Sequence, residues 1–132
     1  MSIYNQLIFK KAREKRFKKK LSKKTCAFSG ENSSCGDQIT IGLEIKDGIV
    51  KDAELDGKGC IISMAAANLL LEEVVGLPVL EAKNRVEWYL EDLKNDTLKT
   101  KNTNLSLLGT VSQNPVRIKC AALPARVLSH LL

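Results

Sequence analysis

Histidines and aromatic residues are scarce in this sequence of 132 residues, which has one histidine, one tryptophan, two tyrosines and three phenylalanines. The histidine, His130, lies near the chain end, and we expect it to be a surface residue rather than a metal ligand. Phe9 and Phe17, which lie among basic residues, are too few to indicate base stacking on nucleic acid. Nucleic acid is therefore not an expected partner.

Long apolar segments are also absent. No run of apolar residues is long enough to span a membrane, and the lysine-rich N-terminus lacks the apolar centre of a signal peptide. We therefore expect a cytoplasmic protein without a membrane partner. Thiols stay reduced in that compartment, so the four cysteines indicate a metal site or catalysis before disulfides. The length fits one domain with its own core.

Positive charge is concentrated near the N-terminus. Residues 1–24 hold ten Lys and Arg side chains and one acidic side chain, a net charge of +9 in a chain whose total is +6. We treat residues 1–24 as a basic N-terminal helix or arm and residues 25–132 as the body. Ser2–Phe17 is predicted to be a short amphipathic helix with one apolar stripe that can dock on the body. A solvated lysine-rich face explains this charge better than nucleic-acid binding does.

The clearest secondary-structure signal is a β-hairpin. Gln38–Lys46 alternates apolar and polar residues with period two, which is typical of a half-buried strand. Asp47 and Gly48 follow, a pair favoured in type I′ turns because both central residues need positive φ. A second strand comes next, with a less regular series of core-facing candidates: Ile49, Lys51, Ala53 and Leu55.

Residues with metal-binding chemistry flank this hairpin. Cys35 and Asp37 precede it and Cys60 follows it, so pairing of the strands should bring these three side chains together. A helix rich in Ala and Leu is predicted over Met64–Val75, with Gly76 just past its end. Cys60 therefore lies near a helix N-terminus, where N–H groups stabilise a thiolate. A buried, unreactive thiol is an equally good interpretation of Cys60 alone.

The rest of the chain favours helices. Helical spacing predicts Pro78–Leu93 and Val116–Leu131, with Pro124 interrupting the hydrogen bonding of the second helix. Between them we expect a polar loop over Lys94–Asn104 and a short helical turn over Leu105–Val111.

These elements predict an α+β fold in which a small antiparallel sheet packs against helices. A third strand is expected near Thr25–Ser33. Cys26 lies in this segment without a second cysteine at metal-ligand spacing, so we interpret it as a bystander thiol.

Three cysteine motifs occur along the chain: Ser34–Gln38, Gly57–Ser63 and Arg117–Leu123. Together they resemble the U-type iron–sulfur cluster assembly family, which includes IscU, SufU and the NifU N-terminal domain. The resemblance covers nearly the whole chain from about Asn32 onward. The start of the chain also looks like the family's opening helix, through Tyr4, Leu7 and Ile8.

Within the family, the chain is most similar to the SufU branch. Cys60 and Cys120 are 60 positions apart, a span that includes the polar loop, where SufU-like members carry an insertion. Lys119 precedes the third cysteine where IscU-like members have a histidine. The lysine-rich segment Lys10–Lys24 and Pro124 depart from the family pattern.

The resemblance implies a SufE/NifU-like single domain with a metal site formed by Cys35, Asp37, Cys60 and Cys120. Three thiolates and a carboxylate suit tetrahedral Zn²⁺, and the three cysteines would alternatively hold a [2Fe–2S] cluster. Cys35 would accept the persulfide sulfur, and Arg117 would support it. The implied partners are a SufS-like cysteine desulfurase and apo iron–sulfur proteins.

Two functions therefore remain open. One is a zinc-bound, sulfurtransferase-like protein that accepts sulfur from the desulfurase. The other is a non-enzymatic scaffold on which a cluster is built and passed to apo-proteins. A structural zinc module that only mediates interactions, and a nucleic-acid binder that uses residues 1–24, are less favoured alternatives.

Overall fold

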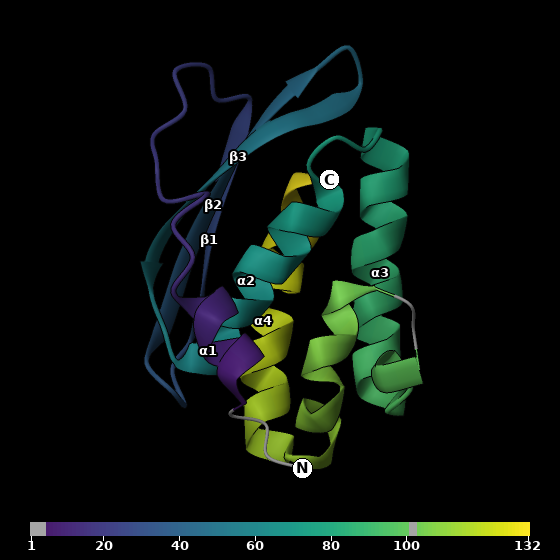
Figure 1. Cartoon of the computed structure of the whole chain (residues 1–132). Helices are drawn as coiled ribbons and strands as arrows, with labels where there is room; N and C mark the ends of the chain where they lie inside the picture. The colour runs from purple at the N-terminus through teal and green to yellow at the C-terminus, as the bar shows by residue number, and fades with distance from the viewer. Residues whose placement is uncertain (1–4, 101–102) are drawn as a thin grey trace.

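The computed structural model describes residues 5–100 and 103–132. A three-stranded antiparallel sheet forms one layer, and the helices pack against one of its faces (Figure 1), which confirms the predicted α+β class. The strands lie in the order β1 (Cys26–Asn32), β2 (Asp37–Lys46) and β3 (Ile49–Lys58). The helices are α1 (Gln6–Ala12), α2 (Ile61–Val74), α3 (Val79–Asn95) and α4 (Pro115–Leu131), with the 3₁₀ helices η1 (Leu98–Thr100) and η2 (Asn104–Gln113) between α3 and α4.

Strands β2 and β3 form the predicted hairpin. Asp47 and Gly48 have φ of 54° and 74°, the two positive values that a type I′ turn needs. This end of the hairpin is tied to the connection between α2 and α3. The N–H of Val50 donates to the carbonyl of Leu77 at 2.9 Å, and the N–H of Gly76 donates to the carbonyl of Val50 at 2.7 Å.

The predicted alternation along β3 is wrong at the start of the strand. Val50 is fully buried, whereas Ile49 is exposed. The register shifts between Glu44 and Ile45 and leaves Lys51 without a partner on β2. A β-bulge of this kind adds one residue to the strand and so reverses which side chains face the core.

Strand β1 confirms the expected third strand and pairs with β2 along its whole length. Gly30 allows β1 to lie close against α4, because a Cβ at this position would press on Val127 and Leu123. The last residue of β1, Asn32, is paired with Asp37, the first residue of β2. A tight turn of four residues therefore joins the two strands.

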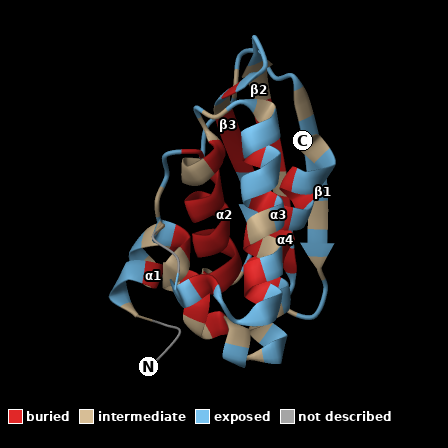
Figure 2. Cartoon of the chain, turned by 90° about the vertical axis from the view of Figure 1, so that its right-hand side faces the viewer, coloured by how far each residue is buried: buried red, intermediate tan, exposed pale blue. Residues whose placement is uncertain are grey.

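Helix α2 is the central helix of the fold. Eleven of its 14 residues are buried, and the ribbon is red along most of its length in Figure 2. A helix that is apolar on all sides has to lie inside the protein, which agrees with its Ala- and Leu-rich sequence. It begins at Ile61, three residues before the predicted start at Met64, because Cys60 caps it.

Helix α1 is shorter than the predicted helix Ser2–Phe17. Asn5 caps its first turn, and it ends at Ala12. The first residues of the predicted helix, 2–4, lie outside the described residues. The chain leaves the helix after Ala12 and runs toward the sheet.

The contacts of α1 explain this early end. The buried side-chain amide of Asn68, on α2, donates to the carbonyl of Lys11 at 2.7 Å and so satisfies a group of the last turn of α1. The ammonium of Lys11 pairs with Glu72 at 2.8 Å. Ile8 and Phe17 are both buried in the core. Burial of Phe17 draws the following chain away from the helix axis.

The segment between α3 and α4 is more ordered than a polar loop. Helix α3 continues two residues past Leu93, and η1 lies inside the predicted loop Lys94–Asn104, of which residues 101–102 fall outside the described residues. The predicted helical turn Leu105–Val111 is a longer 3₁₀ helix. Four apolar side chains of this segment are buried, which accounts for the added order: Leu98, Leu105, Leu108 and Val111.

Helix α4 runs through Pro124 without ending. Proline has no N–H, so the carbonyl of Cys120 lacks its helical donor. The hydroxyl of Tyr89, on α3, donates to the next carbonyl, that of Ala121, at 2.8 Å. In the described ranges, no helix is long and apolar enough to cross a membrane.

Residues 17–24, which we call the basic strap, cover the outer edge of β3. The N–H of Leu55 donates to the carbonyl of Phe17 at 2.7 Å, and the N–H of Leu21 donates to the carboxylate of Glu54 at 3.1 Å. The strap therefore occupies backbone and side-chain groups that an uncovered edge strand would present to other chains.

Two lysines of the strap form ion pairs with β3. Lys19 lies 2.6 Å from Asp52, and Lys24 lies 3.2 Å from the nearly buried Glu54. Burial raises the pKa of Asp52, but the hydrogen bonds from Lys19 and from the N–H of Ala53, together with the nearby positive charges, outweigh burial, so this pKa lies below its usual value. Part of the N-terminal positive charge is thus neutralised within the chain.

Candidate metal and sulfur centre

The turn between β1 and β2 holds Cys35. The N–H of Cys35 donates to the carbonyl of Asn32 at 3.2 Å, and Gly36 follows with φ of 69°. A Cβ on Gly36 would meet no atom within 4 Å, so this side of the turn is open. Cys35 is half-buried. It is therefore the cysteine of this group that lies on a turn and is in part open to solvent.

Asp37 lies beneath this turn and is fully buried. Its Oδ1 accepts the backbone N–H of Cys60 at 2.8 Å, which ties the start of β2 to the start of α2. The starts of β2 and α2 both lie at the lower end of the sheet in the view of Figure 1. Gly59 makes this approach possible, since a Cβ there would press on the Asp37 carboxylate and on Ser63.

Cys60 is the N-cap of α2. Its Sγ accepts the N–H of Ser63 at 3.5 Å, and the hydroxyl of Ser63 donates to the carbonyl of Cys60 at 3.1 Å. Capping by a side chain satisfies one of the free N–H groups of a first helical turn. Cys60 is also half-buried. The structure thus favours the interpretation of Cys60 as a thiol at a helix N-terminus over that of an inert core thiol.

Cys120 comes from α4 and is fully buried. Its Sγ lies 3.2 Å from the Sγ of Cys35. Burial raises the pKa of the Cys120 thiol, and hydrogen bonds with Cys35 and Cys60 add to this, whereas the hydrogen bond from Arg117 opposes it.

Three of the four predicted ligands converge on one point. The side-chain donor atoms of Cys35, Asp37 and Cys120 all lie within 4.8 Å of one another. Among the described residues, Cys60 is not part of this group. It lies close by, since its N–H donates to Asp37 and its thiol contributes to the raised pKa of Cys120. Its Sγ is engaged by the first turn of α2 instead.

Two further side chains donate hydrogen bonds to the sulfur atoms. Arg117, one helical turn before Cys120, directs Nη1 to the Sγ atoms of Cys35 and Cys120 at 3.6 and 3.9 Å. Asn32 directs Nδ2 to Oδ2 of Asp37 at 3.3 Å and to Sγ of Cys120 at 3.6 Å. The sequence does not indicate this role of Asn32, because its contact with Asp37 depends on the register of β1 and β2.

The remaining cysteine and the histidine lie elsewhere. Cys26, at the start of β1, approaches the carbonyl of Leu131 at 3.9 Å, and burial raises its pKa. His130 is exposed and stacks on Phe28 with ring centroids 4.1 Å apart. Among the described residues, neither Cys26 nor His130 belongs to the group formed by Cys35, Asp37 and Cys120.

Comparison with protein families gives a match to the NifU-like N terminal domain over residues 3–122. The chain belongs to this family. The resemblance of the three cysteine motifs to U-type assembly proteins is thereby confirmed.

Two relatives of known name are similar in sequence to this chain over most of its length. An iron–sulfur cluster assembly scaffold protein IscU of Thermotoga maritima is 36% identical over 98% of this chain and 92% of its own. The zinc-dependent sulfurtransferase SufU of Bacillus subtilis is 32% identical over 74% of this chain and 67% of its own. These relatives carry the names of both branches.

A solved structure shares this NifU-like fold. It is an iron–sulfur cluster assembly scaffold protein for the SUF system from Fervidobacterium islandicum. The TM-score is 0.80 at 26% identity, over 97% of this chain and 95% of that one. The similarity extends from α1 to α4, so the N-terminal helix is included.

The donor set of this NifU-like domain fits a soft divalent metal. Thiolates bind Zn²⁺ and iron, and a carboxylate adds an oxygen ligand. A fully buried carboxylate such as Asp37 is unfavourable unless its charge is balanced, and a cation between Cys35, Asp37 and Cys120 would balance it. Cys60 lies next to this group, because its N–H donates to the carboxylate of Asp37.

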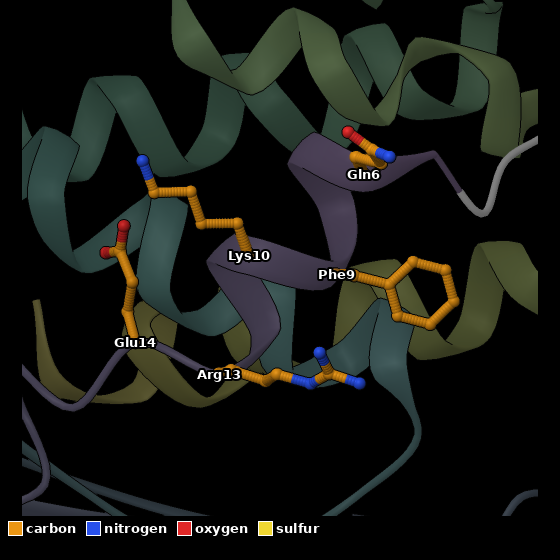
Figure 3. Close-up of a pocket in the computed structure, with 5 residues that line it drawn as sticks. All are labelled: Gln6, Phe9, Lys10, Arg13 and Glu14. Atoms are coloured by element: carbon orange, nitrogen blue, oxygen red, sulfur yellow. The ribbon is translucent and has the colours of Figure 1, made fainter.

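A broad hollow of about 670 Å³ lies away from the cysteines, on α1. Figure 3 shows Phe9 and Arg13 projecting to one side of this helix and Lys10 and Glu14 to the other. The guanidinium of Arg13 lies 5.6 Å from the centre of the Phe9 ring. No cysteine is among the described residues that line this hollow, so it is separate from the group formed by Cys35, Asp37 and Cys120.

Proposed function

We propose that this chain is an iron–sulfur cluster assembly protein of the cytoplasm that accepts sulfur from a cysteine desulfurase through Cys35. Zinc held by Cys35, Asp37, Cys60 and Cys120 would keep the ligand thiols ionised. The observation that carries the proposal is the convergence of Cys35, Asp37 and Cys120 on one point, with Cys60 hydrogen-bonded to Asp37. The name of the SufU relative, a zinc-dependent sulfurtransferase, supports the same reaction class.

The positions of the cysteines support Cys35 as the acceptor. Cys120 lies within α4 and Cys60 caps α2, whereas Cys35 lies on a half-exposed turn beside Gly36. A turn changes conformation at lower energy than a packed helix. Cys35 can therefore leave the site when a partner supplies a competing ligand, while the other three side chains stay in place.

The chemistry is a thiol exchange. The freed thiolate of Cys35 attacks the outer sulfur of the desulfurase persulfide, a new S–S bond forms on Cys35, and the desulfurase thiolate leaves with the electron pair. Arg117 lies within hydrogen-bonding distance of the Cys35 sulfur. Its fixed positive charge would stabilise the anionic sulfur before and after the transfer.

The test is desulfurase turnover, measured as alanine released from cysteine. Addition of this protein should raise the rate, and Cys35→Ser should not, even if that variant retains zinc. Cys26→Ser is the matched control and should stimulate as the unchanged protein does. Full stimulation by Cys35→Ser would show that another thiol accepts the sulfur.

A second candidate function is a scaffold for a [2Fe–2S] cluster. It is favoured by the 36% identity to a scaffold protein named IscU over nearly the whole chain. Cys35, Cys60 and Cys120 would hold the cluster, which apo iron–sulfur proteins would then receive. Anaerobic reconstitution with iron and sulfide, followed by transfer to an apo-ferredoxin, distinguishes this function: a zinc-only sulfur acceptor would transfer no cluster.

A further inference from the structure

The two neighbouring thiols, Cys35 and Cys120, differ in how solvent reaches them. Their Sγ atoms are 3.2 Å apart, yet Cys35 is half-exposed and Cys120 has no exposed surface. A partner approaching from solvent therefore meets Cys35 first. Cys120 lies behind it, on the protein side.

This arrangement fixes the direction from which a sulfur atom would arrive. Sulfur delivered to Cys35 by a partner comes from the solvent side, and the new S–S bond then points outward. Displacement at sulfur needs the attacking atom on the side opposite the leaving atom. Cys120 occupies that side at a distance typical of a near-attack geometry, about 3–3.5 Å.

We propose that Cys120 resolves a persulfide on Cys35 and releases sulfide. This inference rests on the proposed function, in which Cys35 accepts the sulfur. The sulfur of Cys120 attacks the inner sulfur of the persulfide, the Sγ of Cys35. A Cys35–Cys120 disulfide forms, the bond to the outer sulfur breaks, and the outer sulfur leaves with the electron pair and takes up the proton of Cys120 as hydrogen sulfide.

The short distance favours this reaction over passage of the outer sulfur to Cys120. Passage in a straight line needs a sulfur atom between the two Sγ atoms, and two S–S bonds of about 2.05 Å end to end exceed the separation. Attack on the inner sulfur needs the two Sγ atoms to approach by only about 1 Å. Hydrosulfide is also a less basic leaving group than an alkyl thiolate, which speeds its departure.

Arg117 is placed to assist as a positioning residue. Its Nη1 lies within reach of both sulfur atoms. A guanidinium there stabilises negative charge on either sulfur as the proton leaves Cys120. Asn32 adds a further N–H to the sulfur of Cys120.

The experiment follows a persulfide loaded onto the full chain. One sample is loaded with the desulfurase and a stoichiometric amount of cysteine, and another with inorganic polysulfide. After removal of small thiols, released sulfide is measured anaerobically, with zinc supplied or with a chelator present. Non-reducing peptide maps and intact mass then report whether the product has gained a sulfur or a Cys35–Cys120 cross-link.

Three variants separate resolution from metal loss. Cys120→Ser should keep its persulfide, and its sulfide release should slow by on the order of tenfold or more. Cys60→Ser also loses a ligand thiol but keeps the pair, so it should still release sulfide and form the cross-link. Cys26→Ser should behave as the unchanged protein. Release should be faster with the chelator, because a metal-bound thiolate is a weaker nucleophile.

The outcomes distinguish this inference from the proposed function. If the desulfurase loads nothing but polysulfide-loaded protein forms the cross-link, sulfur acceptance fails while resolution by Cys120 stands. If Cys120→Ser releases sulfide as fast as the unchanged protein in both metal conditions, resolution by Cys120 is wrong. Recovery of the extra sulfur on Cys120, with Cys35 free, would overturn it as well.

Discussion

The cysteine end of the molecule and the basic strap both join distant parts of the chain through polar side chains, in different surroundings. At the cysteine end, Asp37 and Cys120 are fully buried, and N–H groups and sulfur atoms serve as their partners. Along the strap, Lys19 and Lys24 pair with carboxylates while their own side chains remain exposed. The free-energy cost of losing a contact is larger at the buried cysteine end than along the exposed strap, because water can replace a lost partner only where it has access.

The strongest test of the cysteine end is removal of one predicted ligand. Structural zinc sites bind with about 10–16 kcal/mol in total, so loss of one of four ligands should weaken zinc binding at least about a hundredfold. Cys60→Ala should show this loss in competition with a chromophoric chelator. Cys26→Ala, which removes a thiol outside the site, should bind zinc unchanged.

The same titration should depend on pH. Each ligand must give up its proton to bind, so zinc affinity should fall as the pH is lowered below neutral. If Cys26→Ala abolished binding and Asp37→Ala left it unchanged, the ligand assignment would be wrong.

The backbone next to the site can be destabilised by a substitution that leaves all four predicted ligands in place. Gly57 has φ of 112°, and a Cβ there would press on the carbonyl of Gln38. We expect Gly57→Ala to lower the free energy of unfolding in urea by about 3 kcal/mol, from strain and displaced backbone. Gly48→Ala meets no neighbouring atom and should lower it by about 1 kcal/mol. Equal losses in the two variants would contradict the close approach at Gly57.

The contribution of Asn32 can be measured separately from that of the ligands. Asn32→Ala removes the N–H donors to Asp37 and Cys120, and the loss of such an outer partner typically lowers metal affinity about 10–100-fold. Ser29→Ala, on the same strand but bonded to Thr40, should leave zinc affinity unchanged. If Asn32→Ala and Ser29→Ala bound zinc with equal affinity, Asn32 would not contribute to metal binding.

The smallest effect is expected in the strap. Lys19→Ala should lower the free energy of unfolding by about 0.5 kcal/mol or less at neutral pH. The lowered pKa of Asp52 means that this stabilisation exists above the ordinary Asp value of 3.8 and is lost as the pH falls through the lower value in the folded protein. Urea unfolding of both proteins at neutral and at strongly acid pH should show a difference only at neutral pH. A difference that persists in acid would point to packing rather than charge.

The sequence predicts the hairpin and the central helix because their signals are local. The alternation of Gln38–Lys46, the pair Asp47 and Gly48, and Gly76 after α2 each act within a few residues. The end of α1 at Ala12 is not local, since it depends on Asn68, more than fifty residues further along the chain. The same holds for the bulge at Lys51.

The site is predictable to a similar degree. The hairpin brings Asp37 next to Cys60, as expected, and family resemblance adds Cys120, which lies beside Cys35. The contacts of Asn32 and the engagement of the Cys60 sulfur by Ser63 require the actual register and helix start. The pairing of Lys19 and Lys24 with β3 cannot be predicted from the sequence either, because charge counts do not show which acidic side chains face a basic segment.

The strap over β3 also limits how this protein can associate through its sheet. Strand addition needs an edge with free backbone groups, and with β3 covered, β1 is the open edge of the sheet as described. Two molecules that paired through β1 would use up both open edges, and no third sheet could then be added. Polymerisation into a fibre needs two growing ends, and the strap removes one of them from every molecule.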